Sequence, residues 1–312
     1  MTASDVTYHD LIAKNRRNSA LLVVGFVLLV AVLVAVMASA LAGGDAAAGL
    51  VFGGLGLVIA IVMALSSYYS GDSMILRMSG AKLIEHGDDP ELYNVVEEMA
   101  IAAGVPPPPI YLIEDTAMNA FATGRDPEHA AVAMTRGLRE TLTRDELQAV
   151  IAHEMSHIRH YDIRLAMLLA TLVGLVVLVT DFYMRGVFWG GVGRRGRGRS
   201  SGGGGGAAML VLAIALAIIA PFFAKIIQMA ASREREYLAD AGAVELTRNP
   251  DAMISALRRL GGDKEVLEVA NRATAHMYIV QPIKKWEARA KGMFATHPSI
   301  DDRVRRIELL TR

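Results

Sequence analysis

One short stretch of the sequence carries histidines and a carboxylate at a spacing that suits metal binding. In HEMSH, residues 153–157, two histidines stand four positions apart and Glu154 follows the first. Residues four apart lie on one face of a helix, so His153 and His157 could bind the same metal ion. Glu154 points partly aside, where it could act as a general base on a water at the metal. The alternative is two half-exposed histidines beside a glutamate.

The surrounding residues indicate that this stretch lies inside a helix. Residues 142–160 have a helical pattern, and Thr143 with Glu146 matches the S/T-x-x-E capping box of a helix start. His160 falls near the same face but close to the helix end, where we expect a polar residue rather than a ligand. The metzincin pattern needs a glycine and a more distant histidine after the motif, and neither is present.

A third ligand must come from elsewhere, because a catalytic zinc site uses three protein ligands and one open position. The segment SREREYLADAGA, residues 232–243, places Glu236 and Asp240 on one helical face. Glu236 could bind the metal while Asp240 accepts an N–H from one of the two histidines. Glu234 lies on nearly the opposite face, so it cannot join Glu236. A charge-rich, solvated helix is the alternative for this segment.

Composition narrows the chemistry further. The 312 residues include 32 lysines and arginines and 32 aspartates and glutamates, so overall charge gives no reason to expect a nucleic-acid partner. The absence of cysteine excludes disulfides, thiol nucleophiles and cysteine-bound zinc. A metal site must therefore use His, Asp or Glu. The hydrophobic content of 53% is high for a soluble protein.

Four apolar runs are candidates for membrane helices, each of which needs about 20 apolar residues. In the second run, Gly49 and Gly53 form a small-xxx-small pair that could allow close helix packing. The third run is short for a span unless Phe182 and Tyr183 extend it. Pro221 is predicted to kink or end the fourth run. The four runs are residues 19–42, 46–65, 165–180 and 207–224.

The polar segments predict a mixed domain that is interrupted by membrane helices. Residues 88–104 predict a helix with Pro90 near its start, and residues 110–114 and 130–135 predict short strands. Residues 185–206, rich in glycine and arginine, predict a flexible loop rather than an RNA-binding segment. We expect five segments in chain order: an N-terminal segment (1–18), a first membrane hairpin (19–70), a first catalytic part (71–164), a second membrane hairpin (165–231) and a second catalytic part (232–312).

Topology constrains where the site can lie. One metal ion cannot be bound from both sides of a membrane, so the third and fourth runs must return the chain to the same side. Lys14, Arg16 and Arg17 precede the first run, whereas the link after it has no positive charge. The positive-inside rule therefore places the site in the cytoplasm. The arginines of 185–206 would then lie outside, against the rule, so either the first hairpin sets the orientation or the second pair forms a shallow membrane-inserted hairpin.

The chain resembles the HtpX-type membrane zinc metallopeptidases, relatives of the CAAX prenyl endopeptidases. The matching stretches occur in the family's order and are MNAFATG (118–124), AVAMTRGL (131–138), ELQAVIAHEMSHI (146–158), SREREYLADAGA (232–243) and THPSIDDRVRRI (296–307). The resemblance implies a mainly α integral membrane protein, with four apolar membrane helices and a zincin-like α+β catalytic domain with a small sheet. It implies one Zn²⁺ per chain, bound by His153, His157 and Glu236, with Glu154 as the base and Asp240 behind a ligand.

The same resemblance implies substrate contacts at Asn119, Ala120 and Phe121, where an extended substrate could pair with a strand edge. His297 is expected to stabilise the oxyanion, and Arg303 to support the substrate site. The implied role is hydrolysis of damaged, unfolded or misassembled membrane proteins at the cytoplasmic face of the cell membrane, together with self-cleavage when the membrane is disrupted. The departures from the family pattern are the glycine content of 185–206 and His160, which lie outside the core motif.

Two other interpretations are open. A processing peptidase specific for one site, of the prenyl-protein type, would need a large intramembrane chamber, for which four spans are few. A non-catalytic membrane scaffold with a structural zinc would normally have four protein ligands. Replacing Glu154 with glutamine separates the cases, because the exchange is harmless in a scaffold but inactivates a peptidase that still holds its metal.

Overall fold

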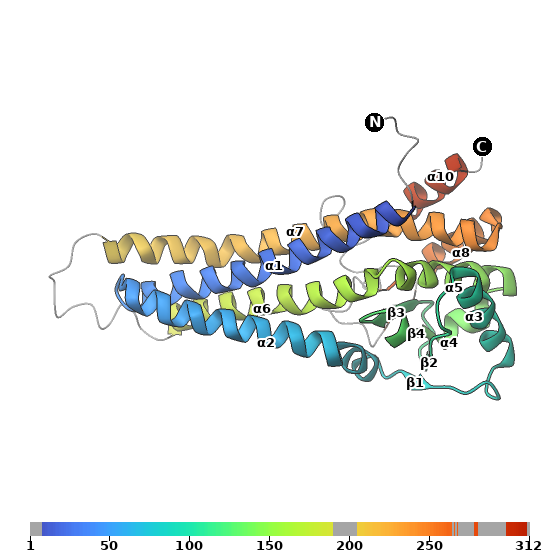
Figure 1. Cartoon of the computed structure of the whole chain (residues 1–312), viewed down its shortest axis with the longest axis horizontal. Helices are drawn as coiled ribbons and strands as arrows, with labels where there is room; N and C mark the ends of the chain where they lie inside the picture. Colours follow the sequence, from blue (N-terminus) through green and yellow to red (C-terminus); the bar gives the residue numbers. More distant parts are fainter. Residues whose placement is uncertain are drawn as a thin grey trace. The chain divides into compact units, whose positions relative to one another are not determined.

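The structure is a computed structural model that describes residues 8–189, 205–263, 265, 267, 278–279 and 298–310. By its internal contacts the chain divides into two compact units. One, here called the helical unit, comprises Met1–Ser66 and Leu168–Gln228. The other, the sheet unit, comprises Ser67–Met167 and Met229–Arg312. Four long helices run through the helical unit (Figure 1): α1 (Tyr8–Leu41), α2 (Ala46–Met78), α6 (Asp162–Trp189) and α7 (Gly205–Thr247). The last three also include residues of the sheet unit.

These four helices contain the four predicted apolar membrane helices, which are thereby confirmed by length and composition. The candidate spans are Ala20–Leu41, Ala46–Met78, Asp162–Val187 and Ala207–Ile227. Leu50 and Val51 are 78% and 69% exposed, as expected of side chains that face lipid rather than water. The third predicted run, residues 165–180, lies within the longer helix α6, which also includes Phe182 and Tyr183. Pro221 does not end the fourth helix, since α7 continues through it.

Glycines of α2 allow a close approach to α1. A methyl group on Gly53 would lie 2.7 Å from the Cβ of Ala35, and one on Gly49 would lie 3.1 Å from the Ala35 carbonyl oxygen. Gly56 approaches Val34 in the same way. The small-xxx-small pair predicted from the sequence therefore contacts a helix of the same chain, where backbones pack closely because side chains are absent.

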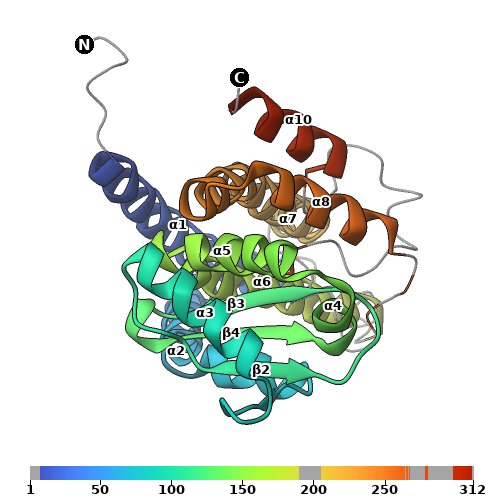
Figure 2. The ribbon, with the colours of Figure 1, turned by 90° about the vertical axis from the view of Figure 1, so that its right-hand side faces the viewer.

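The sheet unit contains a four-stranded mixed sheet with the order β1-β2-β4-β3. Figure 2 shows β2, β4 and β3 next to one another in this order. β2 and β4 are parallel, whereas β3 is antiparallel to β4 and β1 is antiparallel to β2. β2 and β4 are the two strands predicted from the sequence, and β3 forms one edge of the sheet. The strands are β1 (Lys82–Leu83), β2 (Ile110–Ile113), β3 (Ala120–Gly124) and β4 (Ala130–Thr135).

Both faces of the sheet are buried. Side chains alternate along each strand, so Val132 and Met134 of β4 join a core with α3 (Pro90–Ala103) and α5 (Arg144–Arg159). Phe121 of β3 faces the other way and joins a second cluster with Ile75 of α2 and Met167 of α6. Each large apolar side chain buried in this way stabilises the fold by about 1.5–3 kcal/mol. The remaining helices are η1 (Pro127–His129), α4 (Arg136–Thr141), α8 (Pro250–Gly262) and α10 (Ile300–Leu310).

The start of α5 is fixed by its cap and by α8. Thr143 accepts from the backbone N–H of Glu146, and the Glu146 carboxylate accepts from the backbone N–H of Thr143, which confirms the predicted capping box. The other oxygen of Glu146 accepts from Ser255 and Arg259 of α8. The helix that carries HEMSH is therefore held at its N-terminus by side chains from another helix of the sheet unit.

Candidate metal centre

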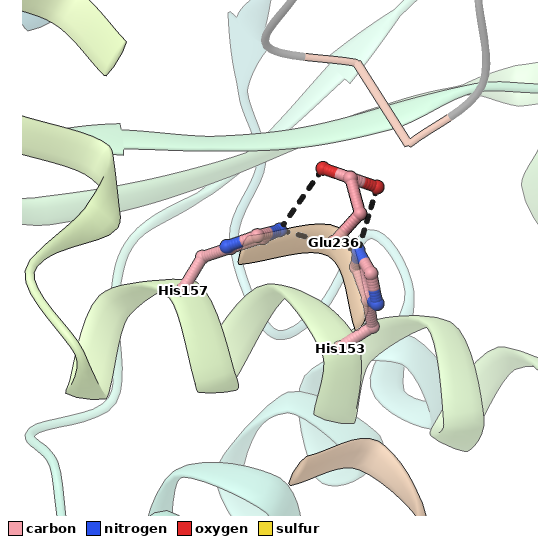
Figure 3. A group of neighbouring side chains, drawn as sticks. All are labelled: His153, His157 and Glu236. Carbon is pink, nitrogen blue, oxygen red and sulfur yellow. Dashed lines mark hydrogen bonds and ion pairs between the residues drawn. The ribbon is translucent and has the colours of Figure 1, made fainter. Parts of the chain in front are cut away.

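Three donor side chains converge inside the sheet unit (Figure 3). The Nε2 atoms of His153 and His157 on α5 lie 3.2 Å apart. The carboxylate of Glu236 on α7 faces both rings, with Oε2 3.7 Å from His153 Nε2 and Oε1 3.6 Å from His157 Nε2. His153 and Glu236 are buried, and His157 is nearly so. The spacing of four residues has therefore brought both imidazoles to one face, as the sequence predicted.

This arrangement fits a tetrahedral metal ion. A metal about 2.0–2.1 Å from each ring nitrogen would separate the two nitrogens by about 3.3 Å at tetrahedral angles, close to the observed 3.2 Å. Two imidazole nitrogens and one carboxylate are a donor set that zinc and related divalent metals use in catalytic sites, where one position stays open.

Small residues on α7 allow Glu236 to reach the histidines. Ala239 and Ala243 are fully buried, and a methyl group on Gly242 would lie 2.2 Å from the Oγ of Ser156 on α5. The two helices therefore touch at a position where only a glycine fits. Glu236 lies on this side of α7, whereas Glu234 is exposed, which agrees with the opposite faces predicted for the two residues.

A buried ion pair lies behind His153. Nδ1 of His153 is 3.0 Å from Oδ1 of Asp240, one helical turn after Glu236. Arg303 of α10 donates to both oxygens of Asp240, at 2.8 and 2.6 Å, and its Nη1 lies 3.3 Å from Glu236. Arg303 is fully buried, so its charge is neutralised by these two carboxylates. The pair fixes Asp240, and Asp240 in turn can fix the His153 ring.

Glu154 lies on the neighbouring side of α5 and faces β3. It is 1% exposed, and its carboxylate accepts a hydrogen bond from the backbone N–H of Ala122. The atom Oε1 is buried and has no hydrogen-bond donor among the described residues. Burial raises the pKa of Glu154 to about 7. A carboxylate whose pKa lies near neutrality is suited to accepting and returning a proton.

The two histidines differ in their protonation. Burial lowers the pKa of His153, although the carboxylate of Asp240, 3.0 Å from Nδ1, opposes the shift. Burial opposes protonation of His157 as well, but the hydrogen bond to Asp162 and the nearby Glu236 carboxylate outweigh it and raise the pKa of His157 to about 10. In the absence of metal the cluster therefore holds a proton on His157, and metal binding has to release it.

Comparisons with known proteins agree with this geometry. The sequence model of peptidase family M48 matches residues 87–311, more than half of the chain. The chain belongs to peptidase family M48. Two curated relatives, each named Protease HtpX homolog, come from Lactiplantibacillus plantarum and Listeria innocua. They are 45% identical over 298 residues and 44% identical over 303 residues, and each match covers 95% of this chain and 98% of the relative.

A solved structure shows a similar fold. The crystal structure of S. mikatae Ste24p aligns with a TM-score of 0.50 and 18% sequence identity. The match covers 81% of this chain but only 57% of the other. The predicted resemblance is thus confirmed, and the chain is an M48 membrane metallopeptidase whose His153, His157 and Glu236 cluster is consistent with an HExxH-plus-Glu metal site.

In this M48 peptidase, Ala120 and Phe121 of the predicted substrate residues lie on β3, the edge strand, and Asn119 directly precedes it. Asn119 is buried next to Thr135, which donates from its backbone to the Asn119 carbonyl. Ala120 and Ala122 face α5, whereas the side chain of Phe121 is 1% exposed and packs against Tyr278. Contact with substrate through these residues stays a prediction, and for Phe121 it would involve the backbone rather than the ring.

The outer edge of β3 is partly paired. The backbone N–H of Ile279 donates to the carbonyl of Ala120 at 2.9 Å, and Arg303 donates to the Ile279 carbonyl at 2.8 Å. The guanidinium of Arg303, which we predict to support the substrate site, contacts Asp240, Glu236 and this backbone carbonyl. A role of Arg303 in substrate binding stays a prediction. His297 lies outside the described residues.

Sequence reasoning missed the partner of the second histidine. Nδ1 of His157 lies 3.3 Å from Oδ2 of Asp162, and Nε of Arg235 lies 3.2 Å from Oδ1 of the same carboxylate. Asp162 precedes an apolar run, so its sequence signal is that of an ordinary acid at a helix start. His160, by contrast, hydrogen-bonds Ser156 at 3.2 Å and lies outside the donor cluster.

Proposed function

We propose that this M48 peptidase is a zinc-dependent endopeptidase of the cell membrane, which hydrolyses unfolded or misassembled membrane proteins on the cytoplasmic side. The observation that carries the proposal is the convergence of His153, His157 and Glu236 beside a buried Glu154 and a sheet edge. The zinc assignment is supported by the donor set and by the 3.2 Å separation of the two ring nitrogens.

In the proposed mechanism, His153, His157 and Glu236 hold the zinc and Glu154 moves the proton. Zinc at this site would supply Lewis acidity that acidifies a water and polarises the scissile carbonyl. Oε1 of Glu154 accepts the proton of the attacking water and later delivers it to the leaving amine. We propose that His297 donates a hydrogen bond to the oxyanion.

The position of β3 at the edge of the sheet supports the proposal that the substrate is unfolded. Strand addition uses backbone hydrogen bonds and requires an extended partner, which folded proteins rarely offer. Backbone pairing along Ala122–Gly124, beyond the Ala120 carbonyl that Ile279 occupies, would read little side-chain sequence, which favours broad specificity over a single processing site. The four candidate spans support a location in a membrane, where membrane proteins would be the available substrates.

The first experiment measures hydrolysis of an unfolded soluble protein by the purified, zinc-loaded chain in detergent, beside Glu154→Gln. We expect cleavage by the unaltered chain, loss of cleavage on chelation, and an inactive variant that retains one zinc per chain. If the variant cleaves as fast as the unaltered chain while both hold zinc, the motif is structural and the scaffold interpretation replaces the peptidase.

Client choice and orientation need separate measurements. In vesicles, a subunit of a membrane complex made without its partner should be cut faster than the same subunit in its assembled complex. Equal rates would contradict a quality-control role without affecting the peptidase assignment. Added protease should reach residues 71–164 in inside-out vesicles only, and access from right-side-out vesicles would contradict the cytoplasmic placement.

A further inference from the structure

The rings of both histidines in the donor cluster are backed by a carboxylate on the nitrogen that points away from the cluster. Asp240 lies 3.0 Å from Nδ1 of His153, and Asp162 lies 3.3 Å from Nδ1 of His157. An Nδ1–H donated to a carboxylate leaves the lone pair on Nε2, which is the atom that faces Glu236 in each ring.

Each of these carboxylates is also anchored by an arginine. Arg303 pairs with Asp240, and Arg235 pairs with Asp162 at 3.2 Å. Asp162 is 4% exposed, so burying its negative charge would be costly without a cationic partner. The site therefore contains two parallel chains of the form His–Asp–Arg, and the sequence predicted both histidines and Asp240 but neither Asp162 nor Arg235.

The backbone around Asp162 is shaped to reach His157. α5 ends at Arg159, and Asp162 is the first residue of α6. Between them, Tyr161 adopts a φ of +62°, a left-handed conformation that is unfavourable for a residue with a large side chain. This turn brings Asp162 back beside the ring of a residue five positions earlier. Strain of this kind persists where the surrounding structure requires it, often at functional sites.

We propose that Asp162, held by Arg235, is the positioning residue that orients His157 for metal binding. Arg235 directly precedes Glu236, so one ion pair links the turn after HEMSH to the segment that supplies the carboxylate of the donor cluster. The inference rests on the proposed ligands of the metal site. It assigns Asp162 a role that an ordinary acid in the first turn of a helix, acting on the helix dipole, does not have.

The test measures zinc affinity of the full chain in detergent by competition with a chelator. Asp162→Asn keeps the shape of the side chain but removes the charge, and we expect zinc to bind about 10- to 100-fold more weakly. Asp145→Asn is the matched control, because Asp145 is an exposed acid in the first turn of α5. Its zinc affinity should stay within twofold. The Co²⁺-loaded chain should show an altered ligand-field spectrum with Asp162→Asn only.

A second variant keeps the inference testable if Asp162→Asn fails to fold. Arg235→Gln leaves the carboxylate in place but removes its anchor, and it should weaken zinc binding less than Asp162→Asn, whereas Arg235→Lys should restore part of the loss. Unchanged affinity and an unchanged cobalt spectrum in Asp162→Asn or Arg235→Gln would overturn the inference. An unaltered chain that binds no zinc would instead overturn the proposed function.

Discussion

Gly242 is where the distance between α5 and α7 can be tested most directly. In Gly242→Ala the new methyl group would lie 2.2 Å from Ser156 Oγ and 2.9 Å from Ser156 Cβ. Rotating the hydroxyl away removes the first clash but leaves the second. The helices must therefore separate by roughly 0.5–1 Å to restore carbon–carbon contact distances. Overpacking of this size typically costs about 1–3 kcal/mol.

The same displacement would change the metal site. Gly242 and Glu236 lie on one helix, so moving α7 away from α5 carries the carboxylate away from the two imidazoles. Metal–ligand distances tolerate only about 0.2 Å. We therefore expect Gly242→Ala to weaken zinc binding at least tenfold and to lower the Tm in detergent by roughly 2–10 °C, measured by chelator competition and by thermal unfolding.

Two further variants show whether the clash is the cause. Gly174 lies in α6 with no atom close to its missing side chain, so Gly174→Ala should leave zinc affinity unchanged and the Tm equal or higher. Ser156→Gly removes both clashing atoms. Gly242→Ala should therefore cost about 1–2 kcal/mol less in a Ser156→Gly chain than in the unaltered chain. A Gly242→Ala chain with the Tm and zinc affinity of the unaltered protein would refute the close packing.

Three other outcomes are expected. Zinc affinity should rise about tenfold per pH unit between pH 7.5 and 9, because only His157 has to release a proton; a pH-independent affinity, measured in a Glu154→Gln background, would contradict this. Hydrogen bonds outweigh burial and lower the pKa of Glu146. Its carboxylate therefore stabilises the fold at pH values above its pKa in the unfolded chain, and this stabilisation is lost as the pH falls through its pKa in the folded chain. Glu146→Gln should cost about 1 kcal/mol at pH 7 and less below about pH 4. Arg303→Met should destabilise the sheet unit by about 3–5 kcal/mol, because it leaves the buried Asp240 carboxylate without its cationic partner; an unchanged Tm would contradict that.

The parts of the site that follow from neighbouring residues could be predicted from the sequence. The face shared by His153 and His157 depends only on helical spacing, and the capping box depends on residues three apart. Spacing to Asp240 and the number of ligands that a catalytic metal needs made Glu236 a candidate, and the family resemblance favoured it over a residue of a solvated helix. Each of these features is set within one turn or two of a single helix.

Contacts between distant segments could not be predicted in this way. Asp162 looks like an ordinary helix-start acid until the turn at Tyr161 brings it back to His157. The pairing of Ile279 with Ala120 joins residues far apart in the sequence and leaves no periodic signal. Pro221 predicted a kink or an end, yet α7 continues through it, as membrane helices often do where neighbours satisfy the freed backbone groups. These features depend on which elements pack together.

The position of Glu236 on α7 also bears on how the enzyme is made. Chains are synthesised from the N-terminus, so both histidines are translated before α6 and α7. With Glu236 as a ligand, the metal site cannot close until the second membrane hairpin has been inserted and the chain has returned to its starting side. On the proposed ligands, insertion would act as an activation step, before which a newly made chain would not cleave the membrane proteins beside it.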